Sequence, residues 1–159
     1  MGRSRRSRAE SARKVILTGQ RDLVAAWMVS KIRDMPAFNS KEFEAIGVVR
    51  DGQLIGGVLY AHYSGLPDGT FDIHMSCAGE GPWLTKATLR AFFEYPFRQL
   101  NCSRVTTLAA KCNRKSRDLT ERLGFAHEGT VRGAFGTFNG VRRDGILFGL
   151  LRDDCKWIK

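Results

Sequence analysis

Apolar side chains recur along this chain at two spacings, one typical of helices and one typical of strands. Helical spacing runs through residues 22–33 and 84–100, and a third amphipathic stretch ends at Gly124. Gly124 is a helix stop signal, and Pro96 is expected to kink the last turn of the second helix. The pattern therefore predicts three helices separated by strands.

The other apolar runs are short and rich in β-branched residues, which indicates strands. Asp51-Gly52 separates two of these runs and is a strong signal for a type I′ turn, and Asn139-Gly140 marks a second hairpin. The expected strands cover residues 15–17, 46–50, 54–62, 70–77, 105–109, 131–138 and 146–151, with a further strand opening at Glu128-Gly129. Helices and strands together predict one α/β domain.

Residues 70–77 alternate between apolar and polar side chains, so one face of this strand is apolar and the other is polar. A polar face inside an enzyme sheet is a place where a reaction centre can lie. His74 lies on it and is the best-placed general base, because an imidazole pKa of about 6.5 suits proton removal from an amine. A half-buried sheet histidine with a hydrogen-bond partner explains His74 equally well, and His62 and His127 rank lower.

The length and the charge distribution divide the chain into a domain and a tail. With 159 residues, the chain is long enough for one domain with a full core and too short for two. We expect residues 14–159 to form this domain and the arginine-rich residues 1–13 to form a basic flexible tail. The tail is either a solvated arm without a role or an arm that makes weak contacts with nucleic acid or the ribosome.

The formal net charge is +10, from 26 Lys and Arg against 16 Asp and Glu. Such a charge attracts polyanions, such as nucleic acid, an acidic protein or a phosphorylated cofactor, and it disfavours polycationic small amines as substrates. A basic nucleic-acid-binding or ribosome-associated protein is therefore one alternative, although no RNA-binding module signature supports it.

Cysteine spacing and hydropathy indicate in which cellular compartment the protein is expected. The four cysteines show no paired C-x-x-C spacing, which suits reduced thiols. The longest wholly apolar run, residues 23–29, is far shorter than a membrane span, and no apolar signal core follows the basic start. We expect a cytoplasmic protein with no membrane partner. His74 and Cys77 lack two further ligands at a recognisable spacing, so we expect no metal site.

Residues 113–132 carry three short motifs in a fixed order. The motifs are Asn113-x-x-Ser116, Leu123-Gly124-Phe125, and Glu128-Gly129 with Arg132 close behind. Together, at this spacing, they resemble the second half of the GNAT acyltransferase fold, and are closest to the branch that acetylates the N-termini of ribosomal proteins. The resemblance covers roughly residues 45–152.

The resemblance implies a single mixed, mostly antiparallel sheet of six to seven strands, flanked by helices and with splayed central strands. It implies that acetyl-CoA, the acyl donor, binds where the fourth and fifth strands splay, and that an amine attacks it directly in a ternary complex. The acceptor would be a protein N-terminus or a small primary amine. Trp27 and Phe38 could line the acceptor pocket or belong to the core.

Between the 70–77 strand and the next helix, GNAT enzymes carry Q/R-x-x-G-x-G/A, which holds the diphosphate of coenzyme A. Aligning this chain puts Glu80 at the basic position, Trp83 at the first glycine and Thr85 at the last small residue. Glu80 would repel phosphate unless it points away, and tryptophan does not permit the close approach that glycine allows. The residues implied to bind the cofactor are Gly81, Trp83, Leu84, Thr85, Lys86, Asn113 and Ser116.

Catalytic roles are implied for His74, Ser116 and Glu128. Many GNAT enzymes protonate the departing thiolate with a tyrosine, and the matching position here is Thr120, which is too weak an acid. Ser116 stabilising the thiolate, or water protonating it, is the expected replacement. Glu128 matches a glutamate of the family and is the second candidate base. Asn113 is either a ligand of the pantetheine arm or a helix N-cap.

Two rival interpretations stay open beside an enzyme. A degenerate GNAT-like domain could bind coenzyme A or a partner without turnover, and Glu80, Trp83 and Thr120 favour it. The other rival is the basic nucleic-acid or ribosome-associated protein described above. A homodimer formed by strand pairing is compatible with the sequence, although no pattern in the sequence requires one.

Overall fold

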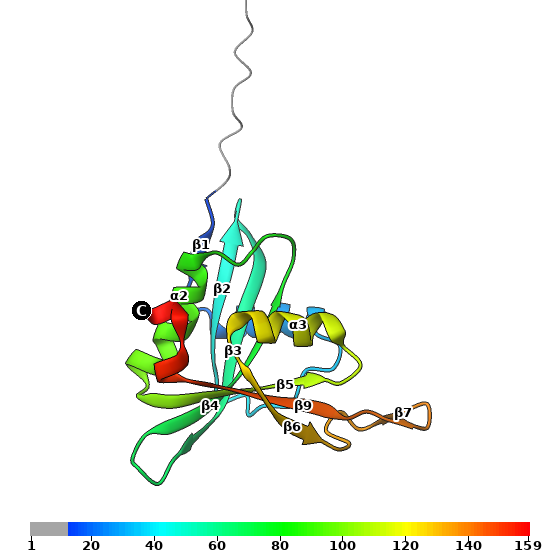
Figure 1. Cartoon of the computed structure of the whole chain (residues 1–159). Helices are drawn as coiled ribbons and strands as arrows, with labels where there is room; N and C mark the ends of the chain where they lie inside the picture. The colour runs from blue at the N-terminus through cyan, green and yellow to red at the C-terminus, as the bar shows by residue number, and fades with distance from the viewer. Residues whose placement is uncertain (1–12) are drawn as a thin grey trace, which may run out of the picture.

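The computed structural model describes residues 13–159, which form one α/β domain (Figure 1). Most expected elements lie within two or three residues of their predicted bounds. In chain order the elements are β1 (Val15–Leu17), α1 (Arg21–Lys31), β2 (Glu44–Arg50), β3 (Gln53–Gly65), β4 (Phe71–Gly79), α2 (Lys86–Glu94), η1 (Tyr95–Gln99), β5 (Cys102–Ala110), α3 (Arg114–Leu123), β6 (Ala126–Val131), β7 (Thr137–Phe138), β8 (Val141–Arg142), β9 (Gly145–Leu151), η2 (Arg152–Asp154) and η3 (Lys156–Ile158).

Seven strands form the main sheet in the order β1-β2-β3-β4-β5-β9-β6. Among the described residues, β4 and β5 form its one parallel pair, and every other pair is antiparallel. The mixed, mostly antiparallel sheet expected from the sequence is therefore confirmed.

The central strands β4 and β5 pair along only part of their length. Their register runs from Phe71 opposite Cys102 to His74 opposite Thr106 and then stops. Beyond this point β4 continues to Gly79 beside β3, and β5 continues to Ala110 beside β9. The two strands therefore diverge, which is the predicted splay.

The hairpin at Asp51-Gly52 is confirmed, and the second hairpin differs from the prediction. Asp51 and Gly52 have φ of 52° and 75°, the two positive values that a type I′ turn requires. The expected strand 131–138 is wrong, because positive φ at Gly133 and Gly136 breaks it into a turn. Only the two-residue strands β7 and β8 flank Asn139-Gly140, while β9 pairs with β5 and β6.

Proline decides how the second helix ends. Pro96 has no backbone N–H, so it cannot make the hydrogen bond that would continue α2. The chain there widens into the π-turn η1, and the N–H of Leu100 donates to the carbonyl of Tyr95. This irregular turn lies at the proline where the sequence predicts a kink. The third helix ends as predicted at Gly124, whose φ of 105° is left-handed.

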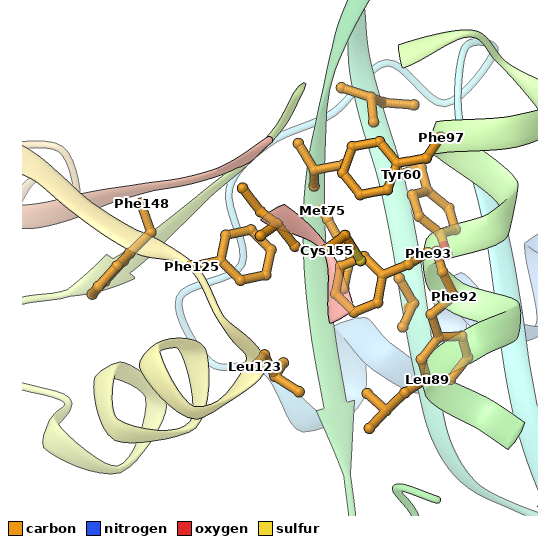
Figure 2. Packing of buried hydrophobic residues seen from close by; sticks show 14 of the residues in the cluster. Tyr60, Met75, Leu89, Phe92, Phe93, Phe97, Leu123, Phe125, Phe148 and Cys155 are labelled. Carbon is orange, nitrogen blue, oxygen red and sulfur yellow. Dashed lines mark hydrogen bonds between the residues drawn. The ribbon is translucent and has the colours of Figure 1, made fainter. Parts of the chain in front are cut away.

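Helices cover both faces of the sheet. Helix α1 packs on β2 and β3 through Val24, Ala25 and Met28, and α2 and η1 pack on the opposite face. Figure 1 shows α2 and α3 in front of the sheet. The larger core lies on their side of the sheet, where Tyr60 and Phe93 are completely buried, and Figure 2 shows aromatic rings of α2 and η1 converging there with residues of β3 and β4.

Two sequence expectations concern the ends and surroundings of the domain. The basic tail predicted for residues 1–13 lies, apart from Arg13, outside the described residues. Within residues 13–159, no helix combines the length and the apolar character that crossing a membrane would need.

We expect Phe93→Ala to lower the free energy of unfolding by about 3–5 kcal/mol, because it removes a fully buried ring from the core. Urea denaturation followed by circular dichroism measures this change. Phe138→Ala is the matched control, since Phe138 is 60% exposed on β7 and should change the stability by less than about 0.5 kcal/mol. Equal losses in the two variants would contradict the assigned core.

Candidate active site

The chain leaves the far end of β4 in a loop that leads to α2. The N–H of Glu80 donates to the carbonyl of Ile55 at 2.8 Å, which fastens the start of this loop to β3. Gly81 has a φ of 61°, and its carbonyl accepts the N–H of Trp83 at 3.0 Å. The predicted binding residues Gly81, Trp83, Leu84, Thr85 and Lys86 therefore follow one another from this turn into the first turn of α2.

Trp83 turns its indole away from the loop and into the core, where only 6% of the residue is exposed. The ring covers Gly56 and Gly79, at which a Cβ atom would overlap atoms of the indole. Trp83 also packs on Phe92, with ring centroids 5.9 Å apart. The bulky side chain at the expected glycine position therefore packs in the core beneath the loop, and Gly56 of β3 and Gly79 of β4 provide the space for it.

Glu80 is paired with a lysine of α1. Its Oε1 lies 2.7 Å from Nζ of Lys31. Both side chains are partly exposed, so the pair contributes little to stability. It does offset the negative charge that would otherwise repel a phosphate at this loop.

The N-terminus of α2 carries a complete capping box. The hydroxyl of Thr85 accepts the N–H of Thr88 at 3.1 Å, and the hydroxyl of Thr88 accepts the N–H of Thr85 at 2.7 Å. The N–H groups of Lys86 and Ala87 have no partner within the helix. Together with the helix dipole and the Lys86 ammonium, they make this terminus suited to an anion.

Asn113 and Ser116 lie at the start of α3, directly after β5. The Oδ1 of Asn113 accepts the N–H of Ser116 at 3.1 Å, so its carbonyl acts as the helix N-cap. Ser116 is partly buried, and its own carbonyl accepts the hydroxyl of Thr120 at 2.8 Å. Thr120 is buried, so the hydroxyl at the position where many GNAT enzymes have a tyrosine is occupied by this hydrogen bond within the helix.

Arg117 follows Ser116 in the same helical turn. Its Nε is buried and has no hydrogen-bond partner within the described part of the chain. A buried guanidinium N–H without a partner is costly. The first turns of α3 therefore contain one buried donor that the described residues leave unsatisfied.

His74 lies where β4 and β5 begin to separate, on the face of the sheet that carries α1. It lines a narrow pocket whose walls come from both splayed strands, from β3 and from the segment after α1. The lining residues are Pro36, Phe38, Leu59, Ala61, His62, His74, Met75, Ser76, Thr107 and Leu108. Phe38 lines this pocket, and both Phe38 and Trp27 pack against the apolar cluster beneath α1.

The surroundings of His74 lower the pKa of its imidazole. Burial is the largest cause, the positive charges of His62 and Arg104 act in the same direction, and the carboxylate of Asp72 opposes them. A lowered pKa keeps the imidazole neutral at physiological pH, which is the state that can accept a proton.

Glu128, the second candidate base, is held by Arg104. Nη1 of Arg104 donates to its Oε1 at 2.9 Å, and a second bond joins Nη2 to Oε2. These hydrogen bonds lower the pKa of Glu128, so its carboxylate is a weaker proton acceptor than an ordinary glutamate. Gly149 of β9 makes the pair possible, because a Cβ there would overlap the carboxylate of Glu128.

The Arg104–Glu128 pair belongs to a polar network that the sequence interpretation does not identify. Nε of Arg104 donates to the hydroxyl of Thr106 at 3.0 Å, and this hydroxyl donates to the carboxylate of Asp72 at 2.9 Å. Asp72 and His74 share the polar face of β4, which the alternation of residues 70–77 already indicates. Arg104 and Thr106 of β5 join this face only through the register between β4 and β5, which the sequence pattern does not specify.

His62 ranks low on the sequence pattern, yet its ring lies 5.1 Å from that of His74 in an edge-to-face arrangement. His127, the third histidine, packs on Phe148 of β9 instead. In residues 13–159, no three His, Cys, Asp or Glu side chains gather closely enough to hold a metal ion.

Comparison with known proteins supports the interpretation of the fold. No family model matches the chain. Over 73 residues, or 46% of the chain, it is 37% identical to the protein named "Putative ribosomal N-acetyltransferase YdaF" of Bacillus subtilis. This match spans 39% of that relative's length.

The chain is also similar to solved structures, among them the following three. A protein described as "Probable acetyltransferase" is 28% identical with a TM-score of 0.59, over 70% of this chain and 63% of its own. The ribosomal-protein-S5-alanine acetyltransferase of Vibrio fischeri is 23% identical with a TM-score of 0.59. The match covers 73% of this chain and 65% of that protein. A variant of the spermidine N-acetyltransferase SpeG of Vibrio cholerae is 15% identical with a TM-score of 0.69. The match covers 92% of this chain and 96% of that protein.

These relatives confirm the predicted GNAT fold, and over 73 residues the chain is similar to a protein named as a ribosomal N-acetyltransferase, as the resemblance predicted. The chain spans less than two thirds of the length of that relative and of the first two structures. The SpeG structure extends the likeness of fold over nearly the whole chain.

We expect Gly79→Ala to destabilise the chain by about 1–3 kcal/mol, because the new methyl would overlap the Trp83 ring and force it to move. Urea denaturation gives the free energy, and near-ultraviolet circular dichroism reports the tryptophan environment. Gly129→Ala is the matched control, since nothing lies within 4 Å of the place that its new methyl would take on β6. Unchanged stability in Gly79→Ala would contradict the packing of Trp83 under the loop.

Proposed function

We propose that this GNAT-fold relative of the ribosomal-protein N-acetyltransferases is itself an acetyl-CoA-dependent N-acetyltransferase acting on a primary amine. The observation that carries the proposal is the divergence of β4 and β5 after His74 and Thr106. One diverging strand leads to the N-terminus of α2, where the N–H groups of Lys86 and Ala87 have no partner within the helix, and the other leads to the Asn113 cap of α3. We place the donor site and a histidine-lined acceptor pocket at this gap in the sheet.

The residues around the gap fit acetyl-CoA. The phosphate groups would be held by the backbone from Gly81 to Lys86, including Trp83, Leu84 and Thr85, because the buried indole and the paired Glu80 carboxylate do not obstruct the loop. Asn113 and Ser116 would face the pantetheine arm. Bound acetyl-CoA supplies the acetyl group and a thiolate leaving group.

His74 is the general base of this proposal. It takes the proton of the attacking amine directly or through a water molecule, while the new C–N bond forms and the C–S bond breaks. The hydroxyl of Ser116 stabilises the departing thiolate, or water protonates it, since a thiol pKa of about 8.5 makes strong acid help unnecessary. Glu128 is the alternative base, and its fixed ion pair with Arg104 favours an orienting role.

Among amines, we favour a protein N-terminus over a polycationic small amine. The relative YdaF is named as a ribosomal acetyltransferase, and the Vibrio fischeri structure is of an enzyme named for ribosomal protein S5. A net charge of +10 also disfavours spermidine-like substrates. A cytoplasmic location, a contact of the basic tail with ribosomal RNA, and a homodimer would fit such a role and rest on this proposal.

The competing function is a domain that binds coenzyme A or a partner without turnover. Thr120 favours it, because the usual tyrosine is replaced by a hydroxyl that is already bonded to the Ser116 carbonyl. The two functions differ in thiol release, which only the enzyme produces.

We expect calorimetric titration of the full chain with acetyl-CoA to show micromolar binding, and a peptide with a free N-terminus to trigger thiol release. A panel of N-terminal peptides and spermidine, with thiol release followed by a colorimetric reagent, measures the acceptor preference. Binding without amine-dependent thiol release would reject the enzyme in favour of the binding domain. An absence of binding would reject both.

We expect His74→Gln to lower kcat/KM by about 10²–10⁴-fold, the usual contribution of a general base. In the unaltered chain, kcat/KM should rise with pH and reach half of its plateau value below about pH 6.5, because the pKa of His74 is lowered and only the neutral imidazole accepts a proton. The pH profile of thiol release checks both points. His127→Gln should retain full activity, and activity of His74→Gln equal to this control would exclude His74 as the base.

A further inference from the structure

The most unusual backbone near the proposed site is the β-bulge of β3. Ala61 lies opposite His74 and Ser64 lies opposite Asp72, so His62 and Tyr63 together face the single residue Ile73. His62, the first residue of the bulge, has a φ of 55°. A left-handed conformation costs a non-glycine residue about 1–2 kcal/mol, and bulges of this kind usually have glycine there.

The bulge changes the face of the sheet to which His62 belongs. Ala61 and His74 are direct partners and share the face that carries α1. In a regular strand the next side chain would point to the opposite face. His62 instead lies on the face of His74, and Tyr63 takes the opposite face, where it stacks on Phe71 with ring centroids 4.4 Å apart.

His62 also holds the segment that closes the pocket. Its Nε2–H donates to the carbonyl of Ala37 at 3.1 Å. Ala37 lies between Pro36 and Phe38, both of which line the pocket. The hydrogen bond therefore fastens the segment after α1, which forms one wall of the pocket, to His62 of β3.

We propose that His62 is a positioning residue of the acetyl-transfer site, brought onto the reaction face by its left-handed bulge. It fixes the wall formed by residues 36–38, against which we place the acceptor amine, and its ring lies 5.1 Å from that of His74, close enough for a charge on one imidazole to act on the other. This inference rests on the proposed acetyltransferase function for its kinetic consequences. The coupling between the two imidazoles and the fixed wall are properties of the chain alone.

The groups that face His74 decide the direction of this coupling. Asp72 of β4 favours the charged imidazole, while Arg104 of β5 and His62 of β3 disfavour it. Arg104 is itself paired with Glu128 of β6. A positive charge on His62 therefore lowers the pKa of His74, and its removal raises the pKa of His74 towards the ordinary value.

Two substitutions separate the contributions of His62. His62→Gln keeps a side-chain N–H for the Ala37 carbonyl and loses the charge. His62→Gly loses both, while glycine adopts the left-handed φ without strain, so the bulge is retained. His127→Gln is the matched control on β6. Because the chain has three histidines, imidazole NMR signals of the full-length protein can be assigned from these variants and His74→Gln.

In His62→Gln and His62→Gly, we expect the NMR titration midpoint of His74 to rise by about 0.5 pH unit or more. Two unit charges about 5 Å apart repel by that amount even in water. In the pH profile of kcat/KM, the rise at acidic pH should shift to higher pH by the same amount as the His74 midpoint. His62→Gly alone should also raise the acceptor KM by about three- to tenfold with kcat nearly unchanged, the effect of one lost hydrogen bond.

The outcomes distinguish the two proposals. A shifted His74 midpoint in a chain that never releases thiol would support the imidazole coupling and reject the acetyltransferase. An active chain in which both His62 variants keep the His74 midpoint and the acceptor KM of His127→Gln would overturn the role of His62. If His62→Gly unfolds, as judged by circular dichroism, the midpoint in His62→Gln still decides.

Discussion

The structure depends on how far β4 and β5 remain paired. Parallel pairing from Phe71 to His74 joins the two halves of the sheet, and its end leaves a gap that no backbone hydrogen bond between the two strands closes. A sheet can tolerate such a gap only if other elements hold each strand. Here β3 holds β4 and β9 holds β5 along their full length beyond the split. The candidate site is therefore a defect in the sheet that the surrounding pairs stabilise.

The two ends of the gap carry different chemistry because different elements approach them. At the outer end, the termini of α2 and α3 present backbone donors and lysine and arginine side chains, which suit a phosphorylated ligand. At the inner end, His62 and His74 lie against the apolar residues of the pocket, with Asp72 beside them on β4. An anionic donor and a neutral amine can thus be held at separate places and meet between the strands.

Two of the three departures from the usual GNAT pattern are compensated by neighbouring residues. Trp83 replaces a glycine, and glycines at positions 56 and 79 accommodate its ring. Glu80 replaces a basic or amide residue, and Lys31 neutralises it. Thr120 replaces a tyrosine and caps a helical carbonyl without a compensating acid. In our proposal, the first two compensations keep the loop suited to phosphate, and the third change leaves thiolate departure to Ser116 or water.

The sequence by itself determined most of the elements, because turns such as Asp51-Gly52, the stop at Gly124 and the apolar periodicity act over a few residues. The arrangement of the sheet was implied only by the resemblance of residues 113–132 to a known fold. It also placed His74 on a polar strand face. Only the tertiary structure decided where Trp83 points, that Arg104 binds Glu128, and that a bulge turns His62 towards His74. These features depend on strand register and on residues distant in the chain, which no local pattern encodes.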